Sequence, residues 1–274
     1  MLRVASGAVL IAATVALVWL APVELLGATA VVVALIGLRE YVTLARQLGQ
    51  NPPGLLAAAF TASACWVIAF QINDGLEVVL ISGFIAASAL VLATSGRTAG
   101  ERAVAASRDE RGSALGDVAA AIFPVLYLGV PLGALVAVQQ VAGRPALFLL
   151  MITIIVSDTA QYYTGRLLGR RPLAPAISPK KTIEGAIGGF VFGGSTLVIA
   201  GHWWLPGMPP GFRALTGTVV VALGIAGDLF ESMLKRSAGV KDSSALIPGH
   251  GGILDRIDAL LFAAPVYYVM LKHV

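Results

Sequence analysis

The chain has 274 residues, of which 57% are hydrophobic and only 12% are charged. A soluble domain usually contains about 25% charged residues. With a mean hydropathy of +0.85, this composition excludes an ordinary soluble domain and indicates an integral membrane protein. The apolar runs are long and unbroken, which excludes the short alternating strands of a β-barrel. The formal net charge of +4 does not indicate nucleic acid as a partner, because membrane topology explains it.

Nine apolar segments approach the roughly 20 residues that a membrane-spanning helix needs. The expected fold is therefore all-α, a polytopic transmembrane helical bundle of about nine spans. We expect the first segment to be retained, because no clear cleavage site precedes the next apolar run. The nine segments are Val4–Ala21, Val23–Leu38, Leu55–Gln71, Leu76–Thr94, Val118–Val138, Ala146–Tyr163, Ile183–Ala200, Leu215–Leu234 and Leu254–Leu271.

The basic residues fall mainly on one side of this alternating topology. Sixteen of the 19 lysines and arginines lie before the first span or in alternate connections, and only Arg144, Arg213 and Lys272 lie on the other side. The positive-inside rule then predicts that the N-terminus and the basic loops are cytoplasmic and that the C-terminus is outside.

Cys65 is the only cysteine in the chain. An intramolecular disulfide and a cysteine-based metal site are therefore excluded. Because it lies in an apolar run, we expect Cys65 to be a small buried hydrophobic residue.

Acidic residues within or beside the apolar spans are costly in a membrane, and they usually face the protein interior or a watery cavity. All of them lie towards the cytoplasmic ends of their predicted helices, which indicates one polar site open to the cytoplasm. They are Asp158, Glu184, Asp228, Glu231, Asp255 and Asp258.

The last two predicted spans combine these acids with basic residues and glycines. Helical spacing places Asp228, Glu231, Ser232 and Lys235 on one face. Carboxylates from two helices can hold a hard cation such as Mg²⁺, while glycines let a backbone approach phosphate closely. This mixture favours phosphoryl or nucleotidyl transfer. The alternative is that the acidic and basic residues only form interfacial ion pairs.

A long motif in this region resembles the signature of the phosphatidate cytidylyltransferases, also called CDP-diacylglycerol synthases. A second stretch, from Ser157 to Gly185, is similar to the same family, and the resemblance covers roughly the second half of the chain. The long motif reads Ser232-x2-Lys235-Arg236-x4-Lys241-Asp242-x4-Ile247-Pro248-x-His250-Gly251-Gly252-x2-Asp255-Arg256-x-Asp258.

The resemblance implies that CTP and phosphatidic acid react to give CDP-diacylglycerol and pyrophosphate with Mg²⁺ as cofactor and a second cation as an option. It implies Asp228 and Asp255 as metal ligands, with Glu231 and Asp258 as further candidates. The expected catalytic residues are Asp228, Asp255, Lys235, Arg236 and Lys241.

The same resemblance implies a set of substrate-binding residues. For His250, two roles stay open: the side chain either maintains the structure of the loop or contacts phosphate. Asp158 is expected to bind metal, nucleotide or a structural arginine. The full set is Asp158, Ser178, Lys180, Lys181, Glu184, Ser232, His250, Gly251, Gly252 and Arg256.

Glycines recur every four residues at Gly185, Gly189 and Gly193. Such a face of small residues indicates close helix packing, either within the subunit or across a homodimer, and not a phosphate loop.

Three other functions compete with this interpretation. A CTP-dependent polyprenol or dolichol kinase would release CDP in place of pyrophosphate. A CDP-alcohol phosphatidyltransferase is disfavoured because its motif is absent. A transporter is disfavoured because its polar groups would be distributed across the membrane.

Residues 1–274 are expected to form a single integral membrane domain, with N-terminal spans in 1–140 and catalytic spans in 146–274. We expect the bacterial cell (inner) membrane as the location, with the active site facing the cytoplasm. The expected partners are CTP, phosphatidic acid and membrane lipids.

Overall fold

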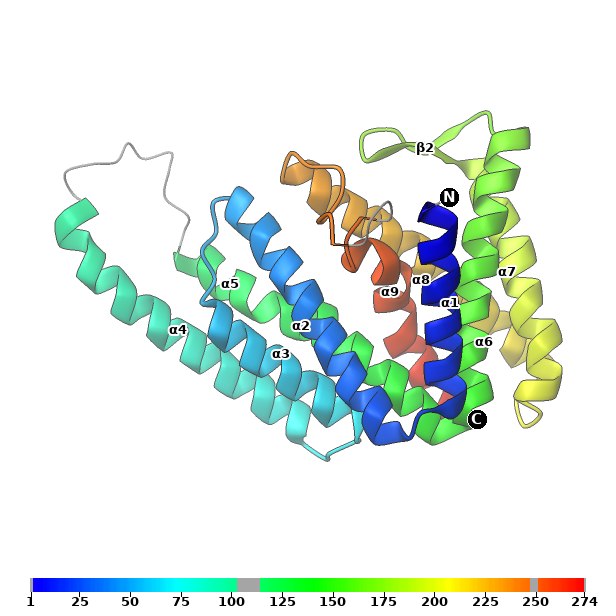
Figure 1. The fold of residues 1–274 in the computed structure, drawn as a ribbon, viewed down its shortest axis with the longest axis horizontal. Coiled ribbons are helices and arrows are strands. Elements are labelled where there is room, and N and C mark those ends of the chain that lie inside the picture. The colour runs from blue at the N-terminus through cyan, green and yellow to red at the C-terminus, as the bar shows by residue number, and fades with distance from the viewer. Residues whose placement is uncertain (1, 103–113, 247–250, 274) are drawn as a thin grey trace.

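The computed structural model describes residues 2–102, 114–246 and 251–273. Its helices lie side by side as a bundle, and one short hairpin stands out at one end (Figure 1). The elements are α1 (Leu2–Leu20), α2 (Val23–Gln47), α3 (Gly54–Ala69), α4 (Gly75–Arg102), α5 (Ala114–Pro124), the π-helical turn η1 (Val125–Gly129), α6 (Val130–Leu168), β1 (Pro172–Ala174), β2 (Ser178–Thr182), α7 (Ile183–Trp204), α8 (Pro210–Ser237) and α9 (Leu254–Leu271).

The predicted all-α bundle is confirmed, and a helix occupies each of the nine predicted apolar ranges. Five helical stretches are long and apolar enough to cross a membrane. One of them, Ala114–Leu168, contains two of the predicted segments. The number of spans stays a prediction.

Gly143 divides α6 into two arms. Its φ of 82° and ψ of 173° are not helical, and a positive φ favours glycine because a side chain would be strained there. Pro145 follows within the same turn and also interrupts helical hydrogen bonding. The break lies between the predicted segments Val118–Val138 and Ala146–Tyr163, and so it separates them.

The start of α1, the β1–β2 hairpin and the α8–α9 connection lie at the same end of the bundle, which we call the hairpin end (Figure 1). The C-terminal end of α9 lies at the opposite end. The hairpin is a difference from the predicted all-helical chain, because Ser178–Thr182 forms a short strand that pairs with β1.

The glycine face of α7 packs against α6 within the subunit. A Cβ atom on Gly189 would lie 2.6 Å from Cγ of Gln161, and one on Gly193 would lie 2.7 Å from Cβ of Ser157. Because α6 of the same chain covers this face, the fold supports helix packing within the subunit. Glycine here lets α6 and α7 approach closely and sets the position of Asp158 on α6.

We therefore predict that Gly193→Ala destabilises the bundle, because the added methyl group would also lie 2.9 Å from Val221 of α8. Overpacking of this kind typically costs about 1–3 kcal/mol. The measurement is the thermal denaturation midpoint in detergent. The matched control is Gly194→Ala, where a Cβ atom meets nothing within 4 Å, and equal midpoints for both variants would contradict the packing argument.

Candidate functional site

A buried lysine joins α8 to α9 at the hairpin end. Nζ of Lys235 lies 2.5 Å from Oδ1 of Asp255 and also forms an ion pair with Glu231, one turn earlier on α8. All three side chains are at most 10% exposed. A buried charge without a partner is costly, so the two carboxylates and the ammonium fix how the two helices meet.

The second oxygen of Asp255 organises the chain that leads into α9. Oδ2 accepts hydrogen bonds from the backbone N–H of Ser243 at 3.1 Å and from the N–H of Gly252 at 2.8 Å, and it shares the single hydroxyl proton of Ser243, at 2.9 Å, with Glu40. Asp255 also lies in the first turn of α9, where the helix dipole favours a negative charge. Both oxygens of this carboxylate are therefore engaged.

Glu40 on α2 is a site residue that the sequence interpretation missed. Its buried carboxylate accepts hydrogen bonds from the hydroxyls of Ser243 and Ser244 at 2.9 and 2.6 Å. It also accepts from the backbone N–H groups of Ile253 and Leu254 at 2.9 and 3.0 Å. Because those N–H groups begin α9 and lack helical partners, Glu40 caps this helix from a distant part of the chain.

Gly252 completes this arrangement. A Cβ atom at this position would collide with the carboxylate of Glu40 and with the hydroxyl of Ser243. The absence of a side chain therefore lets the backbone pass between them. This gives Gly252 a packing role that is independent of phosphate binding.

A second ion pair joins the hairpin to α8. Nζ of Lys181 on β2 lies 2.5 Å from Oδ2 of Asp228. Among the described residues, the other oxygen of Asp228 has only a long hydrogen bond, 3.5 Å, from the hydroxyl of Ser232. Asp158 on α6 lies close enough to interact electrostatically with both Asp228 and Lys181. Elements far apart in sequence thus meet around Asp228.

Asp258 connects the two ion-pair clusters. It interacts electrostatically with Asp228, Asp158 and Lys235. At this level α8 and α9 almost touch, since a Cβ atom on Gly227 would collide with the backbone oxygen of Asp258. The close crossing brings the acidic residues of both helices into one region.

The hairpin that carries Lys181 is held by its own hydrogen bonds. Oε2 of Glu184 accepts from the backbone N–H groups of Arg170 and Arg171 at 3.0 and 3.2 Å. The hydroxyl of Thr182 accepts from the N–H of Gly185 at 3.1 Å and caps α7. Glu184 therefore holds the backbone that leads into the hairpin, and the hairpin in turn positions Lys181.

The remaining basic candidates lie further out. Arg236 is exposed and donates a hydrogen bond to the carbonyl oxygen of Val240 at 2.9 Å. Lys180, Lys241 and Arg256 are also exposed. Ser178 is half-buried on β2 and Gly251 has a φ of 78°, whereas His250 lies outside the described residues. The structure thus separates an inner set of paired charges from an outer set of exposed cations.

Carboxylates outnumber lysines in the inner set. The acids are Glu40, Asp158, Asp228, Glu231, Asp255 and Asp258, and the bases are Lys181 and Lys235. Within residues 2–102, 114–246 and 251–273, no three histidine, cysteine, aspartate or glutamate side chains are grouped so as to hold a metal ion.

Comparison with known proteins gives matches along the chain. The model of a family described as the cytidylyltransferase family matches residues 1–274. The chain is 43% identical over 153 residues to the phosphatidate cytidylyltransferase of Helicobacter pylori strain J99, covering 55% of this chain and 56% of that protein. It is 42% identical over 127 residues to the Aquifex aeolicus protein of the same name, covering 46% of each.

A protein of that name from Mycobacterium tuberculosis strain H37Rv is 40% identical over 164 residues, covering 58% of this chain and 49% of the relative. The chain spans about half the length of the curated relatives it matches.

We predict that Glu40→Gln loosens the α8–α9 connection, because an amide cannot accept all four hydrogen bonds. Losing bonds to a buried charged acceptor should cost about 2–4 kcal/mol. The measurements are the denaturation midpoint in detergent and the rate of trypsin cleavage after Lys241. Glu24→Gln on the same helix, at an exposed position, is the control. A Glu40 variant that matches this control in both measurements would refute the capping role.

Proposed function

The chain belongs to the cytidylyltransferase family, and we propose from this membership that it is a phosphatidate cytidylyltransferase. It would convert CTP and phosphatidic acid into CDP-diacylglycerol and pyrophosphate. The observation that carries the proposal is the convergence of residues that the family resemblance implies for the site. Lys181, Asp228, Lys235 and Asp255 come from β2, α8 and α9 and meet at one end of an apolar bundle.

In the proposed reaction an oxygen of the lipid phosphate attacks the α-phosphorus of CTP. A new P–O bond forms there, the bond between the α-phosphorus and the oxygen bridging to the β-phosphorus breaks, and pyrophosphate leaves with the electron pair. The attacking phosphate is already anionic near neutral pH, so the site needs no strong general base. Catalysis then depends on positioning and on neutralising charge.

The inner charges are suited to that task. Lys181 would exchange its ion pair with Asp228 for a phosphate oxygen, since its half-buried side chain reaches from the hairpin to that carboxylate. Lys235 is buried between two carboxylates, so we assign it mainly to positioning Asp255. Ser232, Asp158 and Glu184 would orient the groups around Asp228 and the hairpin.

The exposed cations would contact the incoming triphosphate. Arg236 and Lys241 flank the α8–α9 connection, and Lys180 lies on the hairpin. Ser178, Arg256 and the backbone around Gly251 and Gly252 complete the expected binding set. Arginine and lysine form strong, charge-assisted hydrogen bonds with phosphate oxygens.

Mg²⁺ fits the donor chemistry of this site. We propose Asp228 and Asp255 as its ligands, with Glu231 and Asp258 as further candidates and room for a second cation. Asp228 offers the less occupied carboxylate, because it has one ion pair and one long contact, whereas Asp255 has an ion pair and accepts three shorter hydrogen bonds. When bound, the ion would neutralise phosphate charge and act as a Lewis acid.

The first test follows phosphorus through the reaction. Purified protein with phosphatidic acid, Mg²⁺ and CTP labelled at the α-phosphate should transfer the label to the lipid and release pyrophosphate. A γ-labelled CTP should leave the lipid unlabelled. Transfer of γ-label with release of CDP would overturn the proposal in favour of a lipid kinase.

Asp228→Asn supplies the matched inactive variant, because it keeps the size of the side chain and removes the charge. Losing such electrostatic stabilisation typically lowers the rate by about 10²–10³. Asp74→Asn at the opposite end of the bundle is the control, since asparagine also tolerates its φ of 55°. Wild-type transfer by the Asp228 variant at limiting Mg²⁺ would remove this residue from the ligand set.

We further propose that the hairpin end faces the cytoplasm of a bacterial inner membrane, where CTP is available. The positive-inside pattern supports this orientation. The start of α1, the β1–β2 hairpin and the α8–α9 connection lie at that end of the bundle, with the end of α9 opposite. A homodimer stays a prediction.

Cysteine labelling tests the orientation. In a Cys65→Ala background, a cysteine replacing Lys241 should be protected from an impermeant maleimide in intact cells and labelled after lysis. A cysteine replacing His273 should be labelled in intact cells. The reverse pattern would place the site on the wrong side for cytosolic CTP.

A further inference from the structure

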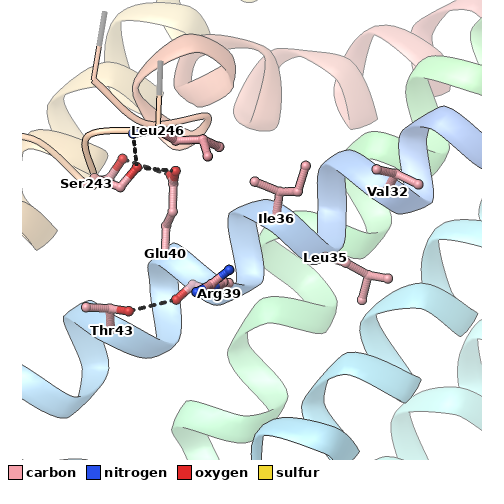
Figure 2. A pocket seen from close by; sticks show the side chains of 9 residues that line it. Val32, Leu35, Ile36, Arg39, Glu40, Thr43, Ser243 and Leu246 are labelled. Atoms are coloured by element: carbon pink, nitrogen blue, oxygen red, sulfur yellow. Dashed lines mark hydrogen bonds between the residues drawn. The ribbon is translucent and has the colours of Figure 1, made fainter. Parts of the chain in front are cut away.

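A groove with a volume of about 610 Å³ runs along α2 beside the α8–α9 connection. Figure 2 shows Val32, Leu35, Ile36 and Arg39 following one another along α2, and Glu40 pointing towards Ser243. The groove thus has an apolar part and a polar end. The polar end is formed by residues that also organise the candidate site.

The apolar part is exposed on a helix that can cross a membrane. Val32 and Leu35 are 55% and 37% exposed, and Leu246 on the other wall is 56% exposed. The helix that carries the first two, Val23–Gln47, is one of the stretches long and apolar enough to span a bilayer. In a membrane these side chains therefore face hydrocarbon and not water.

The polar end carries a cation without a partner among the residues that the structure describes. The Arg39 side chain is exposed, and its only described contact is through its backbone oxygen, which accepts a hydrogen bond from Thr43 at 2.9 Å. The neighbouring Glu40 is fully engaged with the start of α9. Arg39 is thus the cation of this groove that remains available to an anion.

The groove is continuous with the candidate site. The hydroxyl of Ser243 lies on the groove wall and 2.9 Å from oxygens of both Glu40 and Asp255. A molecule seated against this wall therefore reaches the network that holds Asp255. The lining matches a molecule whose apolar chain lies along Val32, Leu35 and Ile36 and whose anionic head lies at Arg39.

We propose that this groove holds the lipid substrate, with one acyl chain along Val32, Leu35 and Ile36 and its phosphate on Arg39. The inference rests on the proposed function, since it names where phosphatidic acid binds. Arginine suits the role because its planar guanidinium can donate two parallel hydrogen bonds to a phosphate.

The kinetic test separates the two substrates. Arg39→Gln should raise the KM for phosphatidic acid about tenfold, the expected loss for a charge-assisted hydrogen bond, while the KM for CTP stays within about twofold. Arg39→Lys should recover part of the loss. Arg46→Gln, an exposed arginine two turns further along α2, is the matched control and should leave both constants unchanged.

A binding test needs no turnover. Phosphatidic acid with a photoreactive diazirine in one acyl chain, in detergent micelles without CTP, should label the peptide that contains residues 32–36. Leu35→Trp fills the groove and should abolish this labelling, whereas Leu25→Trp, exposed near the start of the same helix, should not. Unlabelled phosphatidic acid should compete, and inorganic phosphate should not.

The outcomes distinguish this inference from the proposed function. Wild-type transfer from CTP combined with unchanged constants in Arg39→Gln and labelling elsewhere would overturn the groove and leave the function intact. Absence of any transfer by the wild type would refute the function, and the photolabelling would then decide the groove alone. Disulfide-linked dimers formed by Leu35→Cys would identify the groove as a subunit contact and overturn the proposal.

Discussion

The structure depends on the cost of placing charge inside an apolar helical bundle. An isolated ion there would be unstable, so each buried charge needs a partner that is also held in place. Lys235 meets this requirement with Glu231 on its own helix and Asp255 on the next. The same cost explains why the acids gather at the hairpin end. There water, cations and the proposed phosphate ligands can surround the carboxylates.

This constraint divides the acidic residues by role. Glu40 and Asp255 accept many hydrogen bonds from the protein, so they hold the α8–α9 connection in shape. Asp228 has one ion pair and one long contact, and it shares its surroundings with Asp158. The proposed reaction between two anionic substrates would need both kinds, since reactive groups can stay exchangeable only where other groups are fixed.

The predictable parts were those that local patterns determine. Long apolar runs identified the helices, because burial in lipid demands length and hydrophobicity in each segment alone. Spacing of four placed Glu231 beside Lys235, as found. Glu40 could not be found this way, because the predicted span ended at Leu38 and the partners of Glu40 lie more than 200 residues away. The available signal was the position of Glu40 itself, an acidic residue just after an apolar segment and within α2. The pairing of Lys181 with Asp228 also depends on a hairpin that no apolar pattern reveals.

The long reach of Glu40 has a consequence for how the protein is made. Its partner Ser243 follows 203 residues later in the chain, and synthesis at about 5–20 residues per second separates the two by roughly 10–40 s. During that interval the glutamate is already at the membrane without the serines and N–H groups that later surround it. The N–H groups at the start of α9 follow Glu40 by more than 210 residues, so the charged centre closes only after that stretch has been translated. A nascent chain that has not yet reached α9 would therefore carry Glu40 without the two backbone N–H groups that it caps.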